Sequence, residues 1–352
     1  MTCILPVLGH TYHSFTSEMA SFLGSGKIHA GIIYKQWMKK GRLCREDPAF
    51  TTAAVLFDRI STSTDFSVPL LVRQREDQEA VKFLLRTHDG FDIESVFLPM
   101  KNHNTLCVSS QVGCRMGCSF CETGRMGLLR NLTPEEIVSQ VYIARFGLNM
   151  NIRNIVFMGM GEPFDNYDAV MQAVKVLTDQ NGLAFGMNNI TVSTSGKVCG
   201  IHKLMNEKEL SVNLAVSLTS AKVDTRSRLM PITKKHSLDE LYQAMEGYCS
   251  KTKKQILVAC ALMKGVNDGI DDADSLVDFL QGLDVKVNLI PYNPQRVDRY
   301  ACPDWSTIEA YAARLRDRGL RVLLRHTKGR SSMAACGQLG VKNSPFAPRC
   351  VR

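Results

Sequence analysis

The sequence contains no apolar run that approaches the ~20 residues needed to cross a membrane, so we expect no membrane-spanning segment. Its first residues, Met-Thr-Cys-Ile-Leu-Pro-Val-Leu, lack the basic region and the cleavage site of a secretory signal peptide. The chain also has no internal repeat and no low-complexity segment. These absences argue against a membrane protein and an exported protein, and they favour a globular protein of the cytoplasm.

Paired cysteine spacing is missing as well. The 12 cysteines are scattered over 352 residues without the pattern of a secreted disulfide scaffold, which fits a reducing cytoplasm. With 45% hydrophobic and 22% charged residues, the chain can bury one large core, or one large and one small. The formal net charge of +9 is compatible with a polyanionic partner such as nucleic acid, but charge alone does not select one.

One stretch concentrates its cysteines, from Cys107 to Cys121. Cys114, Cys118 and Cys121 have the spacing C-x3-C-x2-C, and Cys107 stands seven residues before the first of them. Three thiolates on one short loop can bind three irons of a four-iron cluster and leave the fourth iron open. At an open iron, S-adenosylmethionine (SAM) can coordinate and be cleaved reductively to a 5′-deoxyadenosyl radical. The spacing therefore predicts a radical-SAM [4Fe-4S] cluster.

The alternative for the same cysteines is a structural zinc site completed by a histidine, with His103 as the nearest candidate. Zinc sites usually pair their cysteines and place a second pair of ligands some distance further on. This chain has one compact triad and no second pair at that spacing, so the cluster is the favoured interpretation.

From about residue 93, apolar β-branched segments alternate with amphipathic ones, as in parallel βαβ units. Capping boxes that start at Thr133 and Ser237 predict where two of the helices begin. The expected strands are 105–110, 152–158, 189–193, 211–218, 255–262 and 285–291, with a further short strand at 320–325. The expected helices are 134–146, 166–179, 200–207, 237–250, 271–282 and 305–318. Six strand–helix units predict an α/β fold with a partial (β/α)6 barrel.

Residues 1–92 are expected to form a small, mostly helical N-terminal domain. In its clearest helix, within 29–42, four apolar side chains fall on one face: Ile32, Ile33, Trp37 and Met38. Basic side chains would then face the solvent: Lys35, Lys39, Lys40, Arg42 and Arg45. They are either a phosphate-contacting surface with an aromatic anchor or a solvated face above a buried Trp37, and the sequence leaves both open.

In βα barrels the functional residues lie on the loops that follow the C-terminal ends of the strands. The cysteine loop follows the first expected strand, and polar or glycine-containing motifs follow four of the others. These motifs are Gly-Met-Gly-Glu-Pro at 159–163, Ser-Thr-Ser-Gly at 193–196, Ser-Leu-Thr at 217–219 and Pro-Tyr-Asn-Pro at 291–294. Each is weak alone, but five motifs at one rim of one barrel predict a binding site.

Each motif offers groups that suit SAM. Gly161 lets the backbone approach a ligand closely, and Glu162 can accept hydrogen bonds from the α-ammonium group. Ser193 and the strand end 217–219 offer hydroxyl and backbone groups to the carboxylate and the ribose. Asn293 carries a donor and an acceptor for the adenine edge or the ribose, although alone it would read as a turn residue. The residues expected to contact SAM are therefore Gly161, Glu162, Ser193, Ser217, Leu218, Thr219 and Asn293.

A late segment, Lys-Gly-Arg-Ser-Ser-Met-Ala-Ala-Cys-Gly-Gln-Leu-Gly at 328–340, surrounds Cys336 with small residues. Such a segment can approach other groups closely. A cysteine of this kind is more often a passive buried thiol than a nucleophile, and the same holds for Cys107. The residues alone leave both cysteines unassigned.

Taken together, these motifs resemble the radical-SAM RNA adenine methyltransferases of the RlmN/Cfr type over roughly residues 93–340. The resemblance rests on the cysteine triad and on 107–114, 130–133, 157–163, 193–196, 288–294 and 334–339. The triad alone is typical of the whole radical-SAM superfamily. The triad together with the upstream Cys107 and the late Ala-Ala-Cys-Gly-Gln-Leu is specific to this group.

The resemblance implies methylation of an adenine ring carbon, C2 or C8, in rRNA and/or tRNA, with two SAM molecules per turnover. One SAM methylates Cys336, and the radical from the second takes a hydrogen from this S-methylcysteine. The resulting carbon radical adds to adenine, and Cys107 resolves the adduct by forming a disulfide with Cys336. By its position before Cys107, Glu94 matches the proton acceptor of the family. The resemblance also implies an electron donor such as flavodoxin or ferredoxin.

The resemblance divides the chain into three parts. Residues 1–92 are expected to be an accessory, RNA-contacting domain, 93–330 the radical-SAM core, and 331–352 a tail with the methyl-accepting cysteine. Two positions depart from the family: Arg330-Ser-Ser-Met333 replaces an acidic stretch, and Thr219 stands where a histidine is common. Both are expected near the site, so they bear on the choice of RNA. Nothing in the sequence demands more than a monomer.

Two other functions compete with this one. Another radical-SAM enzyme, such as a methylthiotransferase, would need a second three-cysteine cluster, and the remaining cysteines form no such group. A non-catalytic RNA-binding protein with a structural metal would need the basic surface alone. Because Glu94, Cys107, the triad and Cys336 are all present, the methyltransferase is the favoured hypothesis.

Overall fold

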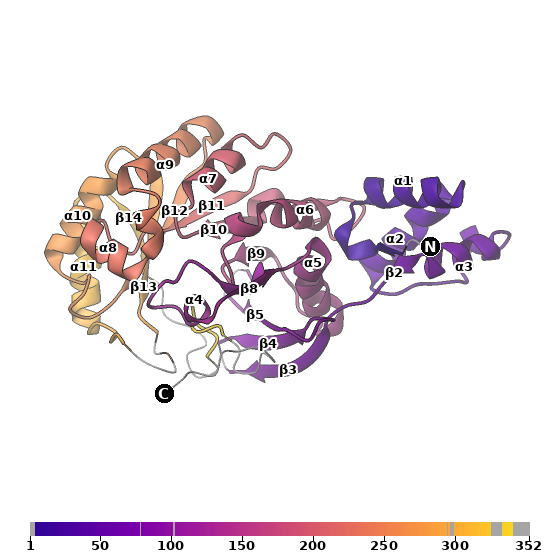
Figure 1. Ribbon diagram of the computed structural model, residues 1–352, viewed down its shortest axis with the longest axis horizontal. Helices are drawn as coiled ribbons and strands as arrows, with labels where there is room; N and C mark the ends of the chain where they lie inside the picture. The colour runs from indigo at the N-terminus through magenta and orange to yellow at the C-terminus, as the bar shows by residue number, and fades with distance from the viewer. Residues whose placement is uncertain are drawn as a thin grey trace.

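The computed structural model describes residues 4–77, 79–100, 103–293, 295, 299–324 and 333–340. A ten-stranded sheet runs through the molecule in the order β14-β13-β12-β11-β10-β9-β6-β5-β4-β3. The order does not close on itself, so the barrel is open (Figure 1). The expected α/β class and the partial barrel are confirmed.

Seven neighbouring strands of this sheet are parallel. They are β6 (Thr105–Cys107), β9 (Asn154–Phe157), β10 (Ile190–Thr194), β11 (Asn213–Ser217), β12 (Ile256–Leu262), β13 (Val285–Pro291) and β14 (Arg321–Leu324). The six expected strands and the short seventh one are confirmed, and residue 325 lies outside the described residues. Parallel neighbours need long crossover connections, which explains the alternation of strands and helices.

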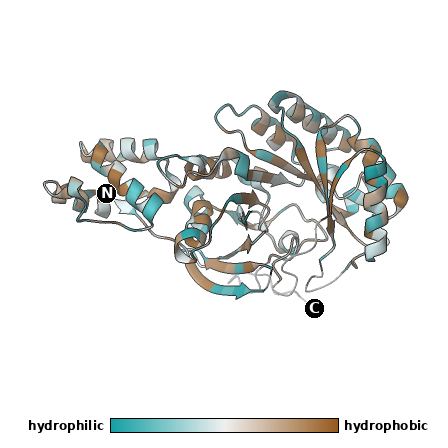
Figure 2. Cartoon of the chain, turned by 180° about the vertical axis from the view of Figure 1, so that it is seen from behind, coloured by the Kyte–Doolittle hydropathy of each residue, from teal (hydrophilic) through white to brown (hydrophobic). Residues whose placement is uncertain are grey.

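Helices pack on the outside of the parallel strands, and much of the ribbon of these strands has the brown of hydrophobic residues in Figure 2. They are α5 (Pro134–Tyr142), continued by a π-helix (Ile143–Gly147), α6 (Tyr167–Thr178), α7 (Val198–Met205), α8 (Val223–Leu229), α9 (Leu238–Thr252), α10 (Ile270–Leu280) and α11 (Trp305–Asp317). Short 3-10 turns lie at Val7–Gly9, Pro48–Phe50, Pro163–Asn166, Met187–Asn189 and Pro231–Lys234. The capping boxes at Thr133 and Ser237 are both formed, whereas α8 was not expected from the sequence.

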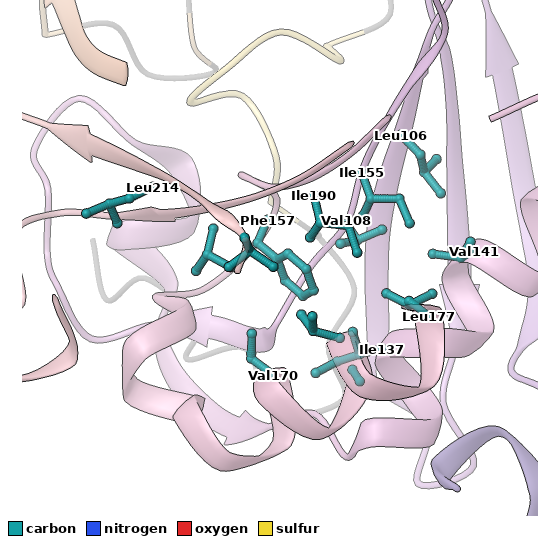
Figure 3. Packing of buried hydrophobic residues seen from close by; sticks show 14 of the residues in the cluster. Leu106, Val108, Ile137, Val141, Ile155, Phe157, Val170, Leu177, Ile190 and Leu214 are labelled. Atoms are coloured by element: carbon teal, nitrogen blue, oxygen red, sulfur yellow. The ribbon is translucent and has the colours of Figure 1, made fainter. Parts of the chain in front are cut away.

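The main hydrophobic core lies between the sheet and these helices. Every second side chain of a strand points to the same face, so β9 contributes both Ile155 and Phe157 to it. Figure 3 shows these two residues against Ile137 of α5 and Val170 of α6, and at most 1% of any of the four is exposed. This layer holds the strand ends that carry the rim loops.

Three antiparallel strands extend the sheet beyond β6. They are β3 (Leu70–Glu76), β4 (Val81–Arg86) and β5 (Asp92–Leu98), and β5 pairs with β6. The predicted domain boundary between residues 92 and 93 therefore falls inside the sheet. As a division into domains it stays a prediction, but the helical part of the N-terminal region is shorter than expected.

The N-terminal helices α1 (Tyr12–Leu23), α2 (Lys27–Lys40) and α3 (Ala54–Thr62) cluster at one end of the molecule (Figure 1). Two short strands, β1 (Leu5–Pro6) and β2 (Thr64–Asp65), pair within the same cluster.

Trp37 of α2 connects this cluster to the barrel. Its ring stacks on Tyr142 of α5, with centroids 5.2 Å apart and planes at 20°. The ring thus serves packing, while the basic side chains around it are exposed: Lys35, Lys39, Lys40, Arg42 and Arg45. Among the described helices, none has both the length and the apolar composition needed to cross a membrane.

Candidate active site

The cysteine triad lies on a small structure beside the main sheet. β7 (Gln111–Cys114) and β8 (Gly127–Asn131) form an antiparallel pair, with α4 (Glu122–Met126) between them. Cys114 is the last residue of β7, and Cys121 is the residue before α4. The pair is unusually close at Gly113, where a Cβ atom would lie 1.9 Å from the carbonyl oxygen of Gly127.

The three thiols of the triad line one cavity of about 190 Å³. Burial is the largest effect on each of them, and it raises the pKa of Cys114 to about 12. It also raises the pKa of Cys118 and of Cys121. Thiols whose pKa is raised are stable as neutral groups, so a metal that binds them must displace their protons. Three such sulfur donors in one cavity fit a cluster of irons.

The zinc alternative named His103 as the nearest candidate for the histidine that completes the triad. The structure places His103 in a different cavity of about 680 Å³, together with Arg145 and Arg153. This histidine is therefore not brought to the cysteines.

The loops after β9, β10, β11 and β13 meet at the same cavity as the triad, as the barrel rim predicts. Five expected SAM contacts line it together with Asn293: Gly161, Glu162, Ser193, Ser217 and Thr219. Leu218 does not line the cavity, because its side chain is buried in the main core. The structure thus brings six of the seven residues together around one space.

Gly161 ties the cysteine loop to the rim. Its φ is +102°, and a Cβ atom at this position would lie 2.6 Å from the Cβ atom of Gln111. The next residue, Glu162, donates its backbone N–H to Oε1 of Gln111 at 2.8 Å. The close approach that only glycine permits therefore holds the loop after β9 against the strand that ends in Cys114.

The Glu162 carboxylate is buried, with 2% of the residue exposed. Its Oε2 accepts hydrogen bonds from the N–H and the hydroxyl of Ser195, at 2.8 and 2.9 Å, and its Oε1 accepts one from Phe164 N at 3.2 Å. Burial raises the pKa of Glu162, and these hydrogen bonds oppose the shift. The carboxylate is thus fixed in direction at the cavity wall before any ligand arrives.

A group that the sequence did not single out lies beneath this rim. Arg226 of α8 is 1% exposed, and its guanidinium donates to the carbonyls of Leu218, Ser195 and Ser217 at 3.1, 2.9 and 3.3 Å. It also donates to the Thr233 hydroxyl at 2.5 Å. Arg226 therefore joins the loop after β10 to the end of β11.

The charge of Arg226 sits close to the triad. Burial lowers the pKa of its guanidinium to about 10, and the negative charge of Cys118 acts in the opposite direction. A guanidinium with a pKa of about 10 remains charged at neutral pH. A buried cation that interacts with Cys118 favours the ionised, metal-binding form of this thiol.

The antiparallel extension carries the second set of expected residues. Val96 of β5 stands opposite Cys107 of β6, and Leu84 of β4 stands opposite Glu94 of β5. Because side chains alternate between the two faces of a sheet, Glu94, Val96 and Cys107 share one face. The same register puts Lys82, opposite Val96, on this face as well.

The segment Met333–Gly340, which contains Cys336, covers this face. Ala334 and Leu339 pack in one apolar cluster with Val96 and Cys107. Cys107 is consequently buried, whereas Cys336 is exposed and lines the cavity of the triad.

Hydrogen bonds hold the covering segment to the triad side of the site. Asn293 Nδ2 donates to the carbonyl of Cys336 at 3.0 Å, so this side chain orients the cysteine in addition to lining the cavity. The N–H of Glu122 donates to the carbonyl of Gly337 at 2.8 Å, and the Thr123 hydroxyl donates to that of Leu339 at 2.5 Å. Of the departure at 330–333, residues 330–332 lie outside the described residues.

Thr219, the other departure from the expected pattern, has a φ of +63° and lines the cavity. Its carbonyl accepts a hydrogen bond from Asn267 Nδ2 at 2.7 Å, which holds this left-handed backbone in place. The departure therefore lies at the site, as expected.

Comparisons with known proteins agree with this geometry. Residues 108–280 match the model of the Radical SAM superfamily. The chain is 51% identical over 336 residues to the “Probable dual-specificity RNA methyltransferase RlmN 1” of Protochlamydia amoebophila, across 96% of this chain and 94% of that one. It is 37% identical over 343 residues to the “Dual-specificity RNA methyltransferase RlmN” of Magnetococcus marinus, across 96% and 95%. A solved radical SAM methyltransferase from Sphaerobacter thermophilus superposes with a TM-score of 0.88 and 36% identity, over 95% of this chain and 98% of that one.

Proposed function

The chain belongs to the RlmN family of radical SAM RNA methyltransferases, and from this premise we propose that it methylates a ring carbon of adenine, C2 or C8, in rRNA and/or tRNA. The observation that carries the proposal is the position of Cys336. This thiol lines the cavity of the cysteine triad, while the residues around it pack against Cys107. This neighbourhood of Cys336, Cys107 and the triad supports a reaction in which radical formation and transfer of the methyl group take place in one site.

Cys114, Cys118 and Cys121 would hold a [4Fe-4S] cluster with one open iron. When bound, the cluster and its SAM supply a 5′-deoxyadenosyl radical that abstracts hydrogen. Around this cavity, the fixed carboxylate of Glu162 can accept hydrogen bonds from the α-ammonium of SAM, and the hydroxyls of Ser193 and Ser217 suit its polar groups. Two SAM molecules are used per turnover in this scheme.

Cys336 is the methyl carrier in the proposed reaction. As an exposed thiol on the cavity wall it can attack the methyl group of one SAM, and the product is S-methylcysteine. A hydrogen taken from this methyl group leaves a carbon radical that adds to the adenine ring. This route is needed because an sp2 ring carbon is not methylated by simple displacement.

Cys107 and Glu94 complete the reaction after the carbon–carbon bond has formed. Both lie on the face that the Cys336 segment covers, which supports their action on the same adduct. The adduct would return its unpaired electron to the oxidised cluster, and Glu94 would accept the proton of the ring carbon. Cys107 would then attack the sulfur of Cys336, so that the bond from this sulfur to the transferred carbon breaks as the disulfide forms, and the released carbon would take up a proton to become the methyl group of the RNA. A reductant then restores the two thiols.

The remaining partners follow from the same scheme. A one-electron donor such as flavodoxin or ferredoxin would reduce the cluster. The exposed basic side chains around α2 support RNA contacts by the N-terminal region. The enzyme would act in the cytoplasm as a monomer.

The proposal is tested by mass spectrometry and by two cysteine variants. In anaerobically purified protein given iron and SAM, the peptide with Cys336 should carry an added methyl group. Cys336→Ala should abolish RNA methylation, while Cys107→Ala should trap a covalent RNA–protein adduct on denaturing gels. Cys199→Ala, at an exposed cysteine of α7, is the matched control and should turn over normally. Full turnover by Cys336→Ala, or no adduct with Cys107→Ala, would contradict the two-cysteine scheme.

A further inference from the structure

A buried ion pair lies on the face shared by Glu94 and Cys107. Nζ of Lys82 is 2.8 Å from Oε1 of Glu94, and the two side chains are 9% and 6% exposed. Removing two charges from water is costly unless further hydrogen bonds satisfy them. In this pair, the further hydrogen bonds come from the segment that carries Cys336.

Each partner of the pair holds one end of this segment. Nζ of Lys82 donates to the carbonyl of Met333 at 2.9 Å, and the N–H of Gly340 donates to Oε2 of Glu94 at 2.8 Å. The ion pair therefore fastens Met333–Gly340 at both ends, and the segment in turn shields the pair from water.

The segment between these two ends determines the state of both reactive cysteines. It covers Cys107 through Ala334 and Leu339, and it presents Cys336 to the cavity. If the segment lifted, Cys107 would be uncovered and Cys336 would leave its position beside the triad.

We propose that Lys82 is a positioning residue, which together with ionised Glu94 keeps Met333–Gly340 docked, and that the segment lifts when Glu94 takes up a proton. The inference rests on the proposed function, which makes Glu94 the acceptor of the adenine ring proton. The ring proton moves to the carboxylate of Glu94. Opening of the segment Met333–Gly340 involves no transfer of electrons. The neutral carboxyl group no longer attracts the buried ammonium of Lys82, which then gains by returning to water.

Two further ion pairs lie near this one, and each joins its own two side chains. On the same two strands, Arg86 pairs with Asp92 at 2.7 Å, and on α4 Arg125 pairs with Glu122 at 3.1 Å. Proton transfer would therefore open the site at the step where the methylated adenine must leave. Lys82 acts in this scheme through Glu94 and the segment, and it touches neither SAM nor RNA.

The test measures docking directly, in the full-length, cluster-loaded protein under anaerobic conditions and without RNA. Lys82→Met removes one charge at nearly constant length, and Glu94→Gln imitates the protonated state while keeping an acceptor for Gly340. In both variants the rate at which iodoacetamide alkylates Cys107, read on its peptide, should rise by about tenfold or more. Amide hydrogen exchange of the peptide spanning 333–340 should rise with it. Lys82→Arg, which preserves the charge, should remain close to the parent protein.

Arg86→Met is the matched control. It removes an ion pair between the same two strands that does not touch the segment, so the alkylation of Cys107 should stay at the parent rate. The double variant Lys82→Met/Glu94→Gln removes both charges of the pair. Its rate of Cys107 alkylation should therefore rise by less than the rises of the two single variants combined. Parent-like alkylation in Lys82→Met overturns the proposal, and so does an equal rise in Arg86→Met, which would indicate general loosening of the sheet.

The alkylation test gives an answer whether or not the proposed function is correct. If the protein does not methylate adenine, no methylated nucleoside forms in the parent, yet the contrast in Cys107 alkylation between Lys82→Met and Arg86→Met remains measurable. If both hold, Lys82→Met should retain its iron and should still cleave SAM. It should form fewer methylated nucleosides for each 5′-deoxyadenosine than the parent does.

Discussion

The rim of the parallel barrel and the face of the antiparallel extension contribute to one site by different means. At the rim, Glu162 and Arg226 are held by several hydrogen bonds to loops of the barrel itself. The face of β4, β5 and β6 is completed by a segment from the far end of the chain, since Gly340 contacts Glu94 across 246 residues. The rim is built into the fold, whereas the face is assembled on it.

This difference suits the two halves of the proposed chemistry. A cluster and its SAM need fixed ligands, because radical formation depends on close and constant geometry. A cysteine that forms a covalent adduct with RNA and then a disulfide must change its neighbours during turnover. In the proposed scheme the segment with Cys336 would move, whereas the cavity wall around Glu162 would stay in place.

The largest effect is expected from breaking the rim at the cysteine triad, which is proposed to hold the cluster. Cys118→Ser should abolish iron binding and SAM cleavage, because an alcohol oxygen does not replace a thiolate on iron. Iron content and 5′-deoxyadenosine formation measure this loss. Cys249→Ser, at a cysteine outside the cavity, should keep both. If Cys118→Ser retained its iron, Cys118 would not be needed to bind the cluster.

The next effect tests whether the rim depends on Arg226. Arg226→Met leaves the carbonyls of Ser195, Ser217 and Leu218 without their buried donor, and it should lower the free energy of unfolding by about 3–5 kcal/mol. Denaturant unfolding measures the change, and iron loading should fall as well.

Arg228 on the same helix provides the control for Arg226. It is exposed, so Arg228→Met should change the stability by less than about 0.5 kcal/mol. Equal effects at the two positions would contradict a special role for Arg226.

The same comparison explains what the sequence could predict. The strands that carry the rim are runs of β-branched apolar residues. The motifs after them consist of glycines and polar residues that act close to the end of their own strand. Gly161 and Glu162 act within a few residues of the strand that positions them, so their placement follows from strand order. Leu218 is the exception, because strand alternation turns its side chain into the core.

The groups that were missed act over long distances or look ordinary. Lys82, Arg86 and Asp92 were missed and, together with the expected Glu94, they put four charges into two adjacent strands, which hides the apolar alternation of β4 and β5. In the sequence, Arg226 looks like any basic residue of a surface helix. Its carbonyl partners lie on two loops outside its own helix, so no neighbouring residue indicates them. Such partners become visible when the chain is folded.

Thr123 tests the connection between the two regions. Its hydroxyl donates to the carbonyl of Leu339, and the neighbouring Cys121 belongs to the cysteine triad. Thr123→Val keeps the shape but loses the donor, so docking of the segment should weaken by about 1–2 kcal/mol. Faster hydrogen exchange of the peptide 333–340 with unchanged iron content is the expected result. A loss of iron together with faster exchange would mean that the two regions are one structural unit.

The smallest effect should come from a position that belongs to neither region. Ser237 caps α9 through a hydrogen bond from Glu240 N at 3.1 Å, on the outside of the barrel. Ser237→Ala should cost about 1 kcal/mol of unfolding free energy and leave SAM cleavage unchanged. Ser275→Ala, at a serine whose hydroxyl bonds within α10, should cost less. If Ser237→Ala instead slowed SAM cleavage, the rim would depend on the outer helices, and its rigidity would not be a property of the loops and Arg226 alone.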